Sequence, residues 1–174
     1  MPEAPPILPT LAPPKRLFRL VAGTGPGENP LALAPDRADG LFDDPGAWRS
    51  LHLYATRRGA LADALATGQG ISPGWAMADL RCDDRRPFLD ARDPAALPPD
   101  LAALAAAGGW RALIERADDA GLAGVAIPVP AAPTQLLFAL LDPASARLLA
   151  PPKPISPHDP DLRALTRLNH GSHP

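Results

Sequence analysis

Proline is the residue that most restricts how this chain can fold. It occupies 25 of the 174 positions and is concentrated at both ends and in the segments between apolar runs. Because its ring fixes φ and removes the backbone N–H, proline interrupts helices and central strands. We expect a flexible proline-rich arm over residues 1–14, one domain over residues 15–150, and a C-terminal tail over residues 151–174 that carries prolines, histidines and a short helix.

Composition places the chain among globular proteins and argues against several classes of partner. A chain of this length suits one domain with its own hydrophobic core, and 46% of its residues are hydrophobic. A net charge of −2 provides no basic surface for nucleic-acid phosphates. No apolar run approaches the ~20 residues of a membrane-spanning helix, and the lone Cys82 cannot form an intramolecular disulfide. We therefore expect a cytoplasmic protein with no membrane contact and no direct contact to nucleic acid.

The spacing of apolar residues predicts a mixture of strands and helices. The predicted strands are 16–21, 51–56, 77–80, 87–90, 124–129 and 135–141, and the predicted helices are 58–66, 97–107, 110–120 and 161–169. Strands come first, helices follow, and further strands come after them. This order favours an α+β fold over a doubly wound parallel sheet.

Short motifs indicate little about chemistry. The loop Gly23–Gly27 follows a predicted strand and is open to two interpretations, a phosphate-binding loop or a plain connection. Pro26 removes one of the N–H groups that a phosphate would need, which favours the plain connection. The histidines of the tail fit solvated positions better than ligand positions, and no Cys/His spacing typical of a metal site is present. We expect no bound metal.

A longer pattern, spread over residues 16–142, is more specific. Its segments are Phe18-Arg19, Gly40–Pro45, Leu51–Tyr54, Ala60–Asp63, Pro87–Pro94, Gly124–Val129 and Leu136–Leu141. In this order the segments resemble the RES domain, a family of NAD-consuming bacterial toxins. The resemblance implies an ADP-ribosyltransferase-like fold, in which mixed sheets surround a cleft and helices flank them.

The resemblance also implies a set of site residues. Arg19 matches the arginine of the family's first strand and would hold a pyrophosphate or ribose oxygen of NAD. In the family a glutamate follows a strand tyrosine by eleven residues. Asp63 occupies the place of that glutamate, which puts His52 at the position of the tyrosine. Tyr54 is the alternative aromatic residue, because strand alternation places it on the same face as His52. Phe42 would pack beneath the ligand or belong to the core.

This sequence departs from the family at several of these positions. Leu41 replaces an arginine and Val129 replaces a serine, so two polar contacts to the ligand are lost. Arg19, His52 and Asp63 also have ordinary structural interpretations: a strand arginine paired with an acid, a satisfied strand histidine and an exposed helix carboxylate.

Three functions are compatible with the pattern. The first is a RES-type toxin that cleaves the nicotinamide–ribose bond of NAD by phosphorolysis or hydrolysis and is neutralised by an antitoxin protein. The second is a catalytically degenerate ADP-ribosyltransferase-like module that binds a nucleotide or a protein. The third is an ADP-ribosyltransferase that acts on a macromolecule. In the first and third, NAD is the substrate, and in the second a nucleotide or a protein is the ligand. Pairing with a second copy of the chain is a further expectation from the family.

Overall fold

The computed structural model describes residues 7–21, 50–66, 71 and 74–170, and these form an α+β fold. Its strands are β1 (Thr10–Leu11), β2 (Leu17–Val21), β3 (Leu51–Tyr54), β4 (Ala76–Cys82), β5 (Phe88–Asp90), β6 (Gly124–Val129), β7 (Ala132–Leu140) and β8 (Ala146–Pro154). Its α-helices are α1 (Arg57–Ala66), α2 (Pro99–Ala106), α3 (Trp110–Asp119) and α4 (Pro160–His170). The predicted fold class is therefore confirmed, and every predicted helix and strand is present.

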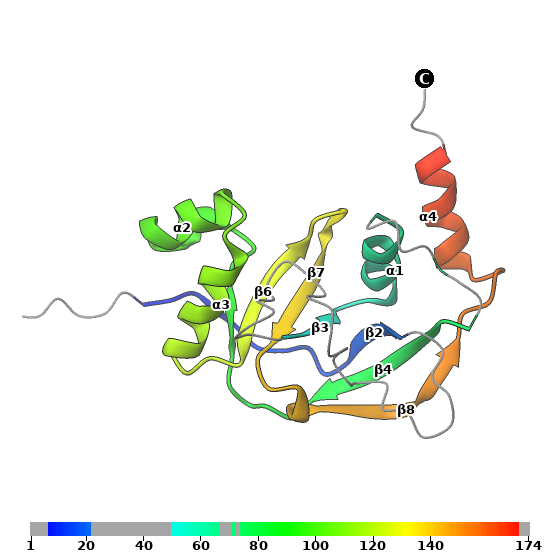
Figure 1. Cartoon of the computed structure of the whole chain (residues 1–174), viewed down its shortest axis with the longest axis horizontal. Coiled ribbons are helices and arrows are strands. Elements are labelled where there is room, and N and C mark those ends of the chain that lie inside the picture. Colours follow the sequence, from blue (N-terminus) through cyan, green and yellow to red (C-terminus); the bar gives the residue numbers. More distant parts are fainter. Residues whose placement is uncertain (1–6, 22–49, 67–70, 72–73, 171–174) are drawn as a thin grey trace, which may run out of the picture.

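The described strands form one mixed sheet in the order β1-β5-β6-β7-β3-β2-β4-β8. All neighbouring strands are antiparallel except β5 and β6. Figure 1 shows α2 and α3 beside β6, and α1 with α4 on the other side of β7, where α1 lies over the middle strands of the sheet. The strand β3, which is central in this order, leads directly into α1.

Strand alternation divides the buried side chains between two clusters, one on each face of the sheet. We call the first the helix core, because Leu61 of α1 and Leu113 of α3 pack in it with Tyr54, Val125 and Leu137 of the strands. We call the second the strand core, because its members come from the strands and the segments that join them. The rings of Phe88 and Phe138 meet edge to face there, with centroids 5.1 Å apart. A period of two along each strand produces this division.

Two strands at opposite edges of the sheet were not predicted. The strand β1 lies inside the proline-rich arm and pairs with β5, with Thr10 opposite Leu89. The strand β8 extends into the expected tail and pairs with β4, although it contains Pro151, Pro152 and Pro154. Prolines are tolerated on an edge strand, because the outward N–H groups have no neighbouring strand to bind.

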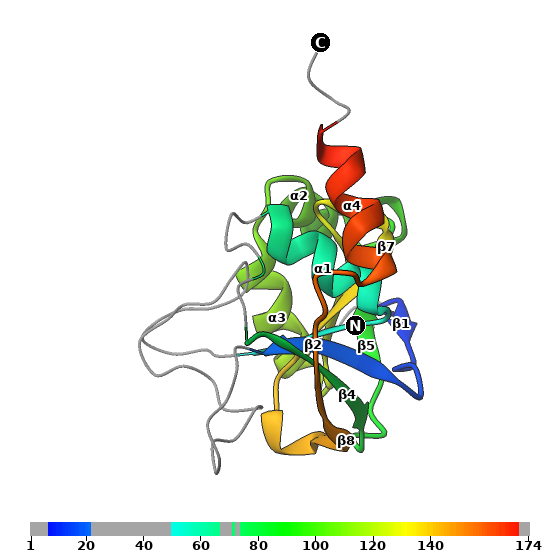
Figure 2. The same cartoon turned by 90° about the vertical axis from the view of Figure 1, so that its right-hand side faces the viewer.

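The carboxylate of Asp159 attaches the C-terminal helix α4 to α1. Asp159 precedes α4 and accepts hydrogen bonds from the backbone N–H groups of Asp161 and Leu162, which caps the helix. The same carboxylate pairs with the guanidinium of Arg57 at 2.6 Å. Figures 1 and 2 both show α4 beside α1. No helix in the described part of the chain is long and apolar enough to cross a membrane.

We predict that Gly124→Ala destabilises the fold by about 3 to 5 kcal/mol, as steric overlap in a packed core does. Gly124 begins β6 with φ +154°, and a Cβ there would lie 1.9 Å from the backbone oxygen of Ala139 on β7. Chemical denaturation measures the loss. Gly121→Ala is the control, because its φ of +70° is strained but a Cβ would meet nothing within 4 Å. This control should lose about 1 kcal/mol, and equal losses in the two variants would contradict the steric argument.

Candidate functional site

The side chains of Tyr54 and Asp63 meet between β3 and α1. The phenol O–H of Tyr54 donates a hydrogen bond to Oδ2 of Asp63 at 2.5 Å. Tyr54 is buried, with 8% of its surface exposed, and Asp63 is half-buried. Only two residues separate the end of β3 from the start of α1, so a spacing of nine residues suffices to bring the two groups together.

The environment of the Tyr54 phenol keeps it protonated. Burial raises its pKa above the usual value of 10.0, and the negative charge of Asp63 and the hydrogen bond to that carboxylate raise it further. The positive charge of Arg19 acts in the opposite direction and lowers the pKa. Tyr54 is therefore a hydrogen-bond donor throughout the physiological pH range, and Arg19 is close enough to act on it electrostatically.

Arg19 lies at the place where two strands of the sheet separate. The strands β2 and β3 share one register pair, Phe18 with Tyr54. A continued antiparallel ladder would place Arg19 opposite Leu53 and then Leu20 opposite His52. Instead, a terminal nitrogen of the Arg19 guanidinium donates to the backbone oxygen of His52 at 3.2 Å. A side chain thus supplies a hydrogen bond where the ladder between the two strands ends.

The predicted site residues divide between the two faces of the sheet. Tyr54 packs in the helix core, and His52 has the same strand parity. Arg19 lies between Leu17 and Val21, both members of the strand core, so its side chain starts from the opposite face. Its guanidinium nevertheless reaches the backbone of β3. Tyr54 therefore contacts Asp63 directly, whereas Arg19 is connected to this pair through its hydrogen bond to the backbone of β3.

The remaining predicted positions contribute differently. Phe42 and Leu41 lie outside the described residues. Val129 ends β6 and is fully buried in the helix core, the same cluster as Tyr54. Its side chain therefore contributes packing to the helix core, at the position where the resemblance implied a serine.

Sequence analysis missed Thr56, which organises the start of α1. Its hydroxyl accepts a hydrogen bond from the backbone N–H of Gly59 at 3.0 Å, as an N-cap residue does. A threonine just before a helical pattern is the signal that identifies such a residue in a sequence.

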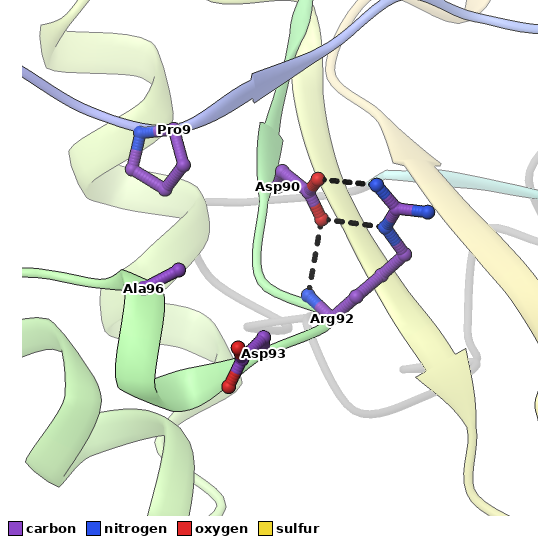
Figure 3. Close-up of a pocket in the computed structure, with 5 residues that line it drawn as sticks. All are labelled: Pro9, Asp90, Arg92, Asp93 and Ala96. Atoms are coloured by element: carbon purple, nitrogen blue, oxygen red, sulfur yellow. Dashed lines mark hydrogen bonds and ion pairs between the residues drawn. The ribbon is translucent and has the colours of Figure 1, made fainter.

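A small depression elsewhere on the surface is lined by Pro9, Asp90, Arg92, Asp93 and Ala96 (Figure 3). In it Arg92 folds back on Asp90 and donates from Nε at 2.8 Å and from a terminal nitrogen at 2.7 Å. These bonds hold the pKa of Asp90 below its usual range. The charges already neutralise each other, and no predicted site residue lines this depression. Among the described residues, no group of three or more His, Cys, Asp or Glu is placed to hold a metal ion.

Among solved structures, the chain is similar in fold to a chain of the M. tuberculosis MbcT–MbcA toxin–antitoxin complex. The TM-score is 0.57, the sequence identity is 16%, and the similarity covers 92% of each chain. No protein-family profile and no curated protein sequence matches this chain. At this identity the similarity defines a shared fold, and it extends over nearly the whole of both chains.

We predict that the phenol of Tyr54 ionises only at strongly alkaline pH. Tyr54 is the one tyrosine in the chain, so the ultraviolet absorbance of tyrosinate reports this group alone. A raised pKa in the folded protein means that the unfolded chain ionises first. The contribution of this group to the free energy of unfolding is therefore fully present below about pH 10. As the pH rises above that value, the free energy of unfolding falls by up to about 1.4 kcal/mol per pH unit. Tyrosinate absorbance should therefore appear together with alkaline unfolding.

Two variants control this measurement. Tyr54→Phe should abolish the absorbance change. Asp63→Asn should let the phenol ionise at a lower pH than in the parent protein. The substitution removes the negative charge that raises the pKa of Tyr54, while the burial of the ring remains. A folded protein whose phenol titrates at the ordinary value would contradict the described contact.

Proposed function

We propose that this chain is a RES-type toxin that degrades NAD by cleaving the nicotinamide–ribose bond. The observation that carries the proposal is the contact between Asp63, the candidate for the family's acid, and Tyr54, the alternative to His52 as its aromatic residue. The fold similarity to a chain of a toxin–antitoxin complex supports the same class of function. It also supports an antitoxin protein as the partner that neutralises the activity.

The chemistry of the reaction explains why a carboxylate is needed. The bond between the nicotinamide nitrogen and the anomeric carbon of the ribose breaks, and its electron pair neutralises the pyridinium. Positive charge then develops on the ribose ring. A fixed carboxylate beside that ring stabilises the charge, which is the general role of preorganised electrostatics. An oxygen of water or phosphate forms the new bond to the anomeric carbon, giving ADP-ribose or its phosphate ester.

Each residue of the proposed site has a distinct role. Asp63 accepts a hydrogen bond from a ribose hydroxyl and stabilises the developing charge. Tyr54 remains protonated and holds Asp63 in place. Because only 8% of its surface is exposed, its ring acts through this hydrogen bond and not by stacking on the nicotinamide. Arg19 already acts electrostatically on Tyr54, so its charge would attract the pyrophosphate of a dinucleotide bound beside the phenol. His52 provides the backbone oxygen that orients Arg19.

One observation favours the second function, a catalytically degenerate binding module. The Val129 side chain is fully buried where the family has a serine, so no hydroxyl reaches the ligand from β6. A nucleotide or protein would then bind beside Tyr54 without being cleaved. Activity measurements separate the two functions.

We predict that the purified full chain releases nicotinamide from NAD and that Asp63→Asn lowers kcat by roughly 100-fold, as the loss of an electrostatic stabiliser does. Glu115→Gln is the matched control. It removes one carboxylate from an exposed ion pair with Arg111 on α3 and should retain activity. Chromatography of the products, with and without phosphate, distinguishes phosphorolysis from hydrolysis.

The proposal also requires that expression of the parent chain, but not of Asp63→Asn, arrests bacterial growth. Absence of NAD turnover at high protein concentration, together with unaffected growth, would rule out the toxin and leave the binding module. Transfer of label from NAD to a macromolecule would instead identify an ADP-ribosyltransferase.

A further inference from the structure

The side chain of Gln135 is joined to the N-terminus of α1 through Thr56. The Thr56 hydroxyl accepts from the backbone N–H of Gly59 at 3.0 Å and donates to Oε1 of Gln135 on β7. One hydroxyl thus caps the helix and attaches it to the sheet. Because both its acceptor and its donor roles are used, its rotamer is fixed from both sides.

The first turn of α1 depends on this cap more than most helices do. Residues 57 and 58 are both arginines, and the first turn contains no acidic side chain. Positive charge at a helix N-terminus opposes the helix dipole. Arg57 is neutralised by Asp159 at 2.6 Å, but the N-terminal N–H groups receive no carboxylate of the first turn. The Thr56 hydroxyl supplies the side-chain acceptor that Gly59 uses.

Gly59 brings this turn close to both β7 and Tyr54. A Cβ at Gly59 would lie 3.3 Å from Cβ of Gln135, 3.4 Å from the Thr56 hydroxyl and 3.7 Å from Cδ1 of Tyr54. The same turn of the helix therefore touches the glutamine and the tyrosine ring. Asp63 follows Gly59 by four residues, so it lies on the same face of α1, one turn further along.

We propose that Gln135 is a positioning residue for Asp63, seating α1 through Thr56 so that the Asp63 carboxylate meets the phenol of Tyr54. The inference rests on the proposed function for its catalytic consequence, but not for its geometry. The Asp63 side chain is short, so its carboxylate reaches the phenol only while α1 stays close to Tyr54. A displacement of about 1 Å can cost on the order of 100-fold in rate. The position of α1 on the sheet should therefore control the rate of NAD cleavage.

We predict that Gln135→Met, which keeps the length of the side chain but removes the acceptor, lowers kcat for NAD cleavage by roughly 10- to 100-fold. KM should change by less than about 3-fold, because the proposed site does not include Gln135. Gln135→Glu keeps an acceptor for the Thr56 hydroxyl and should restore most of the kcat. Thr134→Ala changes the exposed neighbour on the same strand and should behave like the parent.

The single tyrosine provides a readout that does not need activity. When α1 shifts, Asp63 moves away from the phenol, so tyrosinate absorbance in Gln135→Met should appear at lower pH than in the parent, toward its position in Asp63→Asn. Circular dichroism at each pH establishes that the protein is still folded. Should Gln135→Met not fold, Thr56→Val removes the same link, and Thr56→Ser, which keeps the hydroxyl, is its control.

The outcomes separate this inference from the proposed function. A titration that shifts while circular dichroism shows Gln135→Met or Thr56→Val still folded supports the positioning role, even in a protein that does not cleave NAD. A parent-like titration in these folded variants, beside a shifted titration in Asp63→Asn, overturns the positioning role whatever the NAD assay gives. A lowered kcat with an unshifted titration would also overturn it, since the loss would then have another cause.

Discussion

The pairing of β2 with β3, which we call the joint, is the constraint on which the rest of the structure depends. The order of the strands makes one sheet of eight only because these two strands pair, and they do so through one register position, Phe18 with Tyr54. On one side of the joint lie β4 and β8, and on the other lie β7, β6, β5 and β1. The hydrogen bond from Arg19 to the His52 backbone continues the connection where the ladder stops.

The candidate site lies at this joint, and the physics of the joint accounts for its properties. Tyr54 is at once the residue of the shared register pair, a member of the helix core and the donor to Asp63. Its burial, which the packing of α1 completes, keeps the phenol protonated. Arg19 donates a hydrogen bond to the backbone where the ladder between β2 and β3 ends, and it places a positive charge near the same phenol. Packing and electrostatics therefore act on the same few residues, so we expect the site to be sensitive to changes in α1 and β7.

The structure makes Asp63 a more specific candidate than the sequence pattern did. In the sequence, Asp63 is a substitute for a longer acid, and two residues compete as its aromatic partner. In the structure it is held by a hydrogen bond from Tyr54, and the helix that carries it is capped by Thr56 and attached to Gln135 and Asp159. The short side chain of Asp63 reaches the phenol of Tyr54 because Gly59 lets α1 come close to the tyrosine ring.

The sequence by itself determined the positions of the helices and the interior strands, the α+β class, and Tyr54 and Asp63 as candidates. The elements and the fold class depend on local periodicity and on residue types, which are read along the chain, whereas Tyr54 and Asp63 became candidates through the resemblance to the RES domain. The sequence did not determine the edge strands β1 and β8. Prolines in a sequence argue against a strand, but an edge strand tolerates them because its outer N–H groups need no partner. Only the tertiary structure decided that Tyr54 contacts Asp63, that Arg19 starts from the opposite face, and that Gln135, 79 residues from Thr56, binds its hydroxyl. The contacts of Arg19 and Gln135 depend on strand register and packing between distant segments, and the contact of Tyr54 with Asp63 depends on how α1 packs on the sheet; no local pattern records either.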